Sequence, residues 1–172
     1  MKQIVKYSFI AILFLFLSNT GLVAQLQIAH VVSDSIIPKM PAYQSAMSEL
    51  QTYSTILQKQ FEGKEAEMEA YYMNVIDKKK KGLLAPKEEK EAEAKLQEME
   101  ANLKKFGQDM EKQLYEKEGV LMKPIYEEYN QAIKDVSKEN NYTYIIDKKL
   151  TLYSAGGIDA TAKISAKLKI NN

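Results

Sequence analysis

The sequence of 172 residues contains no cysteine, no tryptophan and no arginine, and it has a single histidine. The lack of cysteine excludes disulfide bonds, thiolate metal sites and a cysteine-linked lipid anchor. All 24 basic residues are lysines, and they nearly balance 23 acidic residues, so the formal net charge is +1. Nucleic-acid-binding proteins usually carry a net basic charge and use arginine to contact phosphate and guanine. The composition therefore disfavours nucleic acid as a partner.

Motifs typical of enzymes and of cofactor-binding proteins are also missing. His30 belongs to no His- or Cys-rich motif, and we expect it to have a structural role. The glutamates within residues 88–93 should lie on a solvated helix face, which makes a catalytic or metal-binding carboxylate pair a poor interpretation. Gly156-Gly157 stands alone and does not form a phosphate-binding loop. We therefore expect no enzymatic activity, no metal and no cofactor.

The first 24 residues have the order of a secretory signal peptide. Lys2 and Lys6 precede an apolar run at residues 9–17, and Ala24 is a small residue suited to cleavage before Gln25. The alternative is an uncleaved membrane anchor, but this run is much shorter than the roughly 20 residues that a membrane span needs. We expect cleavage after Ala24 and export to the periplasm. Loss of Lys2 and Lys6 with the leader changes the formal net charge from +1 to −1.

A seven-residue apolar period follows Pro41, which suits the first turn of a helix. Such a period predicts a long helix with a narrow seam for one partner helix, as in a coiled coil. Its seam positions, taken in steps of four and three, are Tyr43, Met47, Leu50, Ser54, Leu57, Phe61, Lys64, Met68, Tyr71 and Val75.

A turn at residues 82–86, marked by Gly82 and Pro86, separates this helix from a second one of similar length. The second seam shifts its phase between Met110 and Leu114, as at a stutter. Its positions are Ala92, Leu96, Met99, Leu103, Phe106, Met110, Leu114, Leu121, Ile125, Tyr129, Ala132 and Val136. Pro124 is expected to kink or restart the helix. We therefore predict a helical hairpin arm over residues 41–123, with each helix roughly 55–60 Å long.

Residues 25–40 and 124–172 should form a small β body at the open end of the arm. Strands are predicted at residues 27–32, 142–146 and 150–153. Gly156-Gly157 should break the last strand, and Asp159 should cap a short final helix. Three short strands cannot bury a stable core alone, so the body should pack on the arm, share a sheet with other copies, or both. The expected fold class is α+β and mostly α.

Two further features of the arm have two interpretations each. The first is the cationic tip, Lys78, Lys79, Lys80 and Lys81, which is either a solvated turn or a contact for anionic membrane headgroups or acidic clients. The second is a set of apolar side chains outside the seam, which either pack on a neighbouring arm or form an adaptable surface for client proteins. The members of this set are Tyr53, Ile56, Tyr72, Met73, Ile76, Leu83 and Leu84.

Residues 25–170 resemble the Skp/OmpH family of periplasmic chaperones. The resemblance depends on the order of several segments along the chain. These are residues 28–35, residues 40–43 at the start of the arm, the lysine- and glutamate-rich hairpin, residues 124–126, residues 139–147, residues 152–153 and residues 159–161.

This resemblance implies a homotrimer in which strands of three chains form a central body. Three arms would surround a cavity that holds unfolded outer-membrane proteins without ATP. The apolar strand residues expected in the trimer body are Ile28, Val31, Ile145, Leu150 and Leu152. The best-known members are strongly basic, whereas this chain is nearly neutral, so apolar contact should carry more of the client binding. The alternative function is a structural or adaptor coiled coil of the cell envelope that binds one folded partner.

Overall fold

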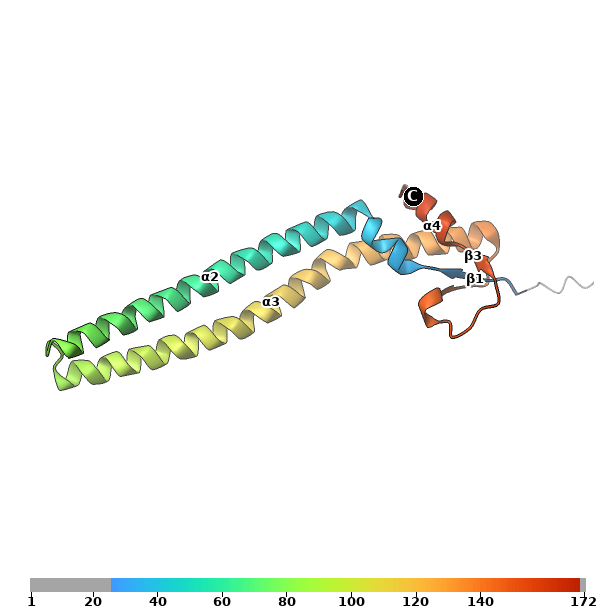
Figure 1. Cartoon of the computed structure of the whole chain (residues 1–172). Coiled ribbons are helices and arrows are strands. Elements are labelled where there is room, and N and C mark those ends of the chain that lie inside the picture. The colour runs from blue at the N-terminus through green and yellow to red at the C-terminus, as the bar shows by residue number, and fades with distance from the viewer. Residues whose placement is uncertain (1–25, 171–172) are drawn as a thin grey trace, which may run out of the picture.

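The computed structural model describes residues 26–170 and shows a long helical hairpin attached to a small body (Figure 1). The elements are β1 (Ile28–Val31), η1 (Ser33–Ser35), η2 (Ile37–Lys39), α2 (Pro41–Lys80), α3 (Pro86–Asn140), β2 (Tyr144–Asp147), η3 (Lys148–Leu150), β3 (Ile158–Asp159) and α4 (Thr161–Lys167). The expected signal peptide, residues 1–24, lies outside the described residues. No helix within residues 26–170 is both long and apolar enough to cross a membrane.

The turn of the hairpin lies where the sequence predicts it. α2 has Pro41 in its first turn and ends at Lys80. Gly82 then adopts a φ of 66°, a left-handed conformation that suits glycine because it has no Cβ. At the start of α3 the Glu88 carboxylate accepts a hydrogen bond of 2.8 Å from the Ala85 N–H. This contact satisfies one of the free N–H groups at the helix N-terminus.

The predicted seams form the contact between the two helices. Leu57 of α2 and Ala92 of α3 are buried, and most other seam positions are half-buried. The rings of Phe61 and Phe106 stack across the seam with their centroids 6.5 Å apart. All predicted seam residues of α3 are at least half-buried, and in α2 only two seam residues, Met47 and Lys64, are exposed.

α3 does not restart at Pro124, contrary to one of the two expectations, but continues to Asn140. A proline inside a helix deprives the carbonyl four residues earlier, here that of Val120, of its donor. The Val120 side chain is exposed, so water can reach this part of the helix. One helix therefore spans both the arm and the body. Asn141 caps the C-terminus of this helix and has a φ of 55°.

The body contains a parallel sheet with strand order β2-β1-β3. The predicted strands at 27–32 and 142–146 correspond to β1 and β2, but the strand predicted at 150–153 is wrong. Asp147 accepts a hydrogen bond from the Lys149 N–H, and the chain turns into η3 and then an irregular segment. A third strand parallel to β1 must come from a crossover, because a tight turn joins only antiparallel neighbours. The chain makes this crossover and forms β3 at Ile158–Asp159.

The core of the body lies between the sheet, the last turns of α3, and α4. Its most deeply buried side chains are Ile36, Met40, Val136 and Ile164. Ala46 and Met122, at the base of the arm, belong to the same buried cluster, so the predicted packing of the body on the lower part of the arm is confirmed. α4 begins where expected, because Asp159 Oδ1 accepts a hydrogen bond of 2.8 Å from the Thr161 N–H.

Candidate functional site: the arm surface and the body edge

Four of the seven predicted off-seam residues are exposed on the arm. These are Ile56, Tyr72, Met73 and Leu83. Ile76 and Leu84 are half-buried. Further exposed apolar side chains, which the sequence reasoning did not include, are Met47, Tyr115, Val120 and Tyr126. The last three are apolar residues outside the seven-residue seam, which is the property that defines the predicted set, whereas Met47 occupies a seam position.

Tyr53, the seventh predicted residue, contacts the partner helix. Its hydroxyl donates a hydrogen bond of 2.9 Å to Gln113 Oε1. Lys117 Nζ lies 5.9 Å from the centre of the Tyr53 ring and 2.5 Å from Glu49 Oε1. These contacts hold α2 against α3, so Tyr53 is less available to a client than the exposed residues.

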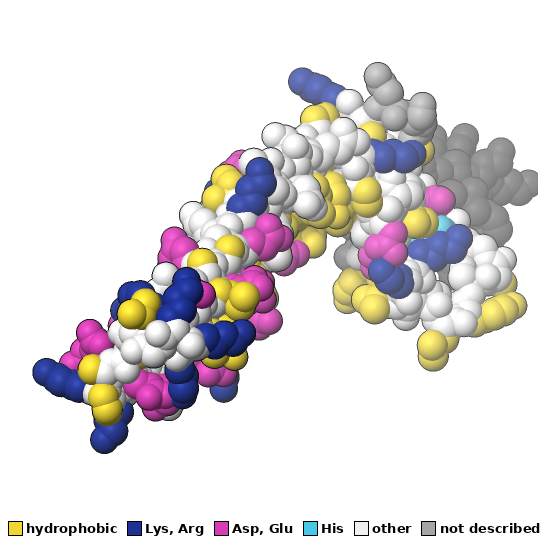
Figure 2. Space-filling view, turned by 60° about the vertical axis from the view of Figure 1, so that its left-hand side comes forward, with side chains coloured by type: hydrophobic (Ala, Val, Ile, Leu, Met, Phe, Trp, Pro, Cys, Tyr) yellow, Lys and Arg dark blue, Asp and Glu magenta, His cyan; other side chains and the backbone are white. Residues whose placement is uncertain are grey.

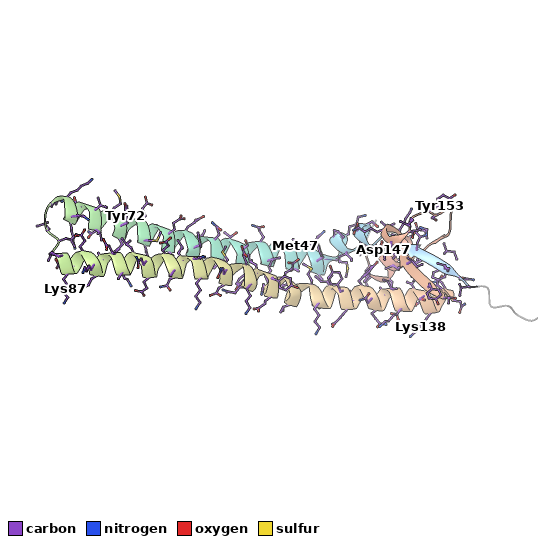
Figure 3. All side chains as sticks on the ribbon, turned by 90° about the horizontal axis from the view of Figure 1, so that it is seen from below. Met47, Tyr72, Lys87, Lys138, Asp147 and Tyr153 are labelled. Carbon is purple, nitrogen blue, oxygen red and sulfur yellow. The ribbon has the colours of Figure 1, made fainter. Side chains whose placement is uncertain are left out.

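Two of the shallow, open grooves between the helices have a methionine and a tyrosine in their lining. The body-side groove is lined by Met47, Leu50, Gln51, Ser54, Glu111, Leu114, Tyr115 and Glu118. The tip-side groove is lined by Met68, Glu69, Tyr72, Leu96 and Glu100. Figure 3 shows Met47 near the body and Tyr72 near the tip, on the same helix. Apolar floors and open sides suit a segment of polypeptide better than an enclosed small molecule.

The lysine run at the tip is partly neutralised. Lys79 pairs with Glu89, which raises the pKa of Lys79 by a side-chain hydrogen bond and by its charge. Lys81 Nζ lies 2.7 Å from Asp77 Oδ2. Lys78 and Lys80 form no ion pair with other described residues. Lysine and carboxylate side chains are interspersed over this end of the arm (Figure 2), so the tip has a mixed charge.

The residues predicted for the trimer body have different environments. Val31 is buried within the chain's own core, Ile145 is half-buried, and Ile28 is exposed. The segment between β2 and β3 carries three exposed apolar side chains, which we call the apolar loop. They are Leu150, Leu152 and Tyr153, with exposed fractions of 76%, 105% and 83%. Figure 3 shows Tyr153 at the outer edge of the body.

His30 lies in the central strand, and its Nε2 is 3.7 Å from Asp159 Oδ2 on β3. Hydrogen bonds from the Thr161 hydroxyl and backbone N–H lower the pKa of Asp159, with smaller contributions from His30 and Lys148. These interactions hold β3 and the start of α4 against β1. Within residues 26–170 no three His, Asp or Glu side chains are grouped as metal ligands. The structural role predicted for His30 is consistent with this position.

The lowered pKa of Asp159 predicts a contribution to acid sensitivity. A carboxyl group whose pKa is below its usual 3.8 in the folded state stabilises the fold when ionised, and this stabilisation is lost as pH falls through the folded-state pKa. From about pH 5 to pH 3, wild type should therefore lose more stability than Asp159→Asn, which keeps an oxygen acceptor for the Thr161 N–H. Urea unfolding at both pH values measures this difference. Equal losses in the two proteins would contradict it.

Comparison with known proteins agrees with this architecture. A model of the family described as outer membrane protein (OmpH-like) matches residues 27–168. The crystal structure of a candidate outer membrane chaperone (OmpH-like) from Caulobacter crescentus CB15 superposes with a TM-score of 0.71 at 17% sequence identity, covering 82% of each chain. No curated protein matches significantly. Since the family model spans nearly all the described residues, the chain belongs to the OmpH-like outer membrane protein family.

Proposed function

We propose that this protein is a periplasmic holdase chaperone that binds unfolded outer-membrane proteins between its arms without ATP. The observation that carries the proposal is the set of exposed methionine, tyrosine and aliphatic side chains on a long two-helix arm. Soluble coiled coils normally place charged and polar residues outside the seam. Large apolar residues at such positions mark an interaction surface.

The chemistry of these side chains favours many weak and adaptable contacts. Methionine is flexible and repacks easily, and tyrosine combines an apolar ring with a hydroxyl group. Met73 and Tyr72 are both about half exposed or more, and Leu83 at the tip is exposed by 67%. Unfolded chains present varied apolar segments, so an adaptable surface of this kind suits them better than one rigid partner.

A trimer would cover the apolar loop and create the cavity. Leu150, Leu152 and Tyr153 lie beside a small sheet with two edge strands, and edge strands with exposed apolar neighbours readily pair with another chain. Three bodies joined there would direct three arms around a shared space. A cleaved signal peptide at residues 1–24 would deliver the protein to the periplasm, and Lys78 and Lys80 could contact anionic headgroups transiently.

The alternative function is an adaptor coiled coil that binds one folded partner of the cell envelope. A single folded partner would need one compact apolar surface on the arm. The exposed apolar residues are instead spread along the arm, from Met47 near the body to Leu83 at the tip, which favours the holdase proposal. An adaptor would capture a specific folded protein and would show no general affinity for unfolded chains.

Purified protein is expected to suppress the aggregation of a urea-unfolded outer-membrane β-barrel at about one trimer per client. Light scattering after dilution from urea measures the suppression, and a folded soluble protein serves as a non-client control. If a folded, trimeric preparation leaves the aggregation unchanged, the holdase proposal is wrong, and the adaptor becomes the better hypothesis.

A further inference from the structure

We propose that one face of each arm selects unfolded segments in which apolar residues are flanked by lysine or arginine. This inference rests on the proposed holdase function and specifies the chemistry of the clients. The sites are the body-side and tip-side grooves, each with an apolar floor and two glutamates at its rim. The rim residues are Glu111 and Glu118 in the first groove and Glu69 and Glu100 in the second.

The two grooves have similar side-chain compositions. Each contains a methionine from α2 and a leucine from α3, namely Met47 and Leu114 near the body and Met68 and Leu96 near the tip. Each also contains a well-exposed tyrosine, Tyr115 in the first groove and Tyr72 in the second. The same pattern of apolar floor, tyrosine and carboxylate rim thus occurs twice along the arm.

Helix periodicity places both grooves on one face. In α2, Met47 and Met68 are three heptads apart, so the seven-residue seam puts them on the same side. In α3, Glu100 and Glu118 are separated by five turns of 3.6 residues. This spacing of 18 residues equals two heptads plus four residues. The four additional residues are those of the phase shift between Met110 and Leu114, which keeps Glu100 and Glu118 on the same side of α3.

The rim carboxylates have no ion-pair partner among the described residues, although several other glutamates of the arm do. Glu91, Glu98 and Glu116 each lie within 4.0 Å of a lysine on their own helix. Lys104 follows Glu100 by one turn but forms no such contact with it. The rims therefore keep charge that is available to a cation from another chain.

Two lysines that line a neighbouring hollow of the hairpin are already engaged. Lys64 Nζ lies 5.4 Å from the centre of the Phe106 ring, and Lys95 Nζ lies 3.2 Å from Glu98 Oε2. The exposed apolar grooves thus coincide with free negative charge, although the chain as a whole is nearly neutral. Charge complementarity of this kind favours a basic, apolar client segment over an acidic one.

The spacing of the grooves sets the length of the segment. Met47 and Met68 are separated by about 30 Å along the helix axis. An extended chain covers this distance with about nine or ten residues. A client with two basic apolar clusters at that spacing can occupy both grooves at once and gains avidity.

The experiment uses the purified protein over residues 25–172 and two fluorescein-labelled unstructured peptides. Both peptides carry two apolar clusters about nine residues apart, flanked by lysine in one peptide and by glutamate in the other. The test variant is Glu69→Gln/Glu100→Gln/Glu111→Gln/Glu118→Gln. The control variant, Glu62→Gln/Glu65→Gln/Glu93→Gln/Glu127→Gln, has the same change in net charge at exposed glutamates that line no groove and form no ion pair with other described residues. Fluorescence anisotropy measures the Kd of each pair.

Wild type and the control variant should bind the lysine peptide about tenfold more tightly than the glutamate peptide, and the groove variant should lose this preference. Equal binding of the two peptides by wild type overturns the inference, as does an equal loss of preference in the control variant. If wild type suppresses aggregation but shows no charge preference, only this inference fails. If it neither binds peptides nor suppresses aggregation, the holdase function fails with it.

Discussion

Serine substitution of Leu150, Leu152 and Tyr153 is expected to convert the proposed trimer into monomers and to abolish aggregation suppression. All three side chains are almost fully exposed in the single chain, so serine should leave the fold of the body unchanged. Burial of one such side chain contributes about 1.5–3 kcal/mol, so three of them contribute at least about 4 kcal/mol to each interface. The affinity between chains should fall about a thousandfold.

Sedimentation velocity at micromolar concentration measures this change. A control variant, Val120→Ser/Tyr126→Ser, removes exposed apolar side chains from α3 outside the apolar loop, and it should remain trimeric. Far-UV circular dichroism should be nearly the same for wild type and both variants, because the loop variant changes no residue of α2 or α3 and the control changes only two exposed positions of α3. A wild-type protein that sediments as a monomer, or a loop variant that stays trimeric, would refute the proposed interface.

The second large effect is expected from the arm surface. Replacement of Ile56, Tyr72, Met73 and Leu83 with glutamine should raise the amount of protein needed for half-maximal aggregation suppression at least about fivefold. These residues lie outside the seam and are exposed. Glutamine is a good helix former at the three positions in α2, and Leu83 is an exposed residue of the turn, so the stability of the hairpin should change little. The loss would then report contact with the client and not unfolding of the arm.

The control for this variant changes polar residues of the same helix without altering the net charge. Lys59→Gln/Glu62→Gln affects two exposed side chains of α2 and should keep wild-type suppression. Light scattering of an unfolded β-barrel measures both variants, and sedimentation checks that both remain trimeric. Full suppression by the glutamine variant would mean that clients bind elsewhere, for example on the cavity wall of the body.

The arm was predictable from the sequence because its structure is determined locally. An apolar residue at every seven-residue repeat over many turns needs a second helix to cover the apolar seam. Gly82 and Pro86 mark the one break between the two periodic segments, so the turn must lie there. Of the predicted seam residues, only Met47 and Lys64 are exposed in the structure. The seven-residue spacing assigns both residues to the seam, but each is exposed for its own reason. Lys64 carries a charge that is costly to bury, and Met47 lines an open groove.

The body was less predictable because its third strand depends on distant contacts. Thr151 and Tyr153 favour strands, but residues 150–153 pair with no strand within residues 26–170. Ile158 and Asp159 form a strand only because they lie beside β1, which a local pattern cannot indicate. The grooves were not predictable for the same reason. Each groove combines rim glutamates and apolar floor residues from two helices that are distant in the sequence, so it exists only once the helices have packed side by side.

The topology of the sheet has a consequence for the order of folding. β1 and β2 are neighbours, yet the whole hairpin lies between them in the chain, and the hydrogen bond from the Val32 N–H to Thr161 Oγ1 joins residues 129 positions apart. Closing so long a loop is entropically costly and slow unless its ends are first brought together. The hairpin does this through local contacts, because its two antiparallel helices return the chain to its starting point. We therefore expect the arm to form first and to bring β1 and β2 together, and the sheet to close only after the hairpin has folded.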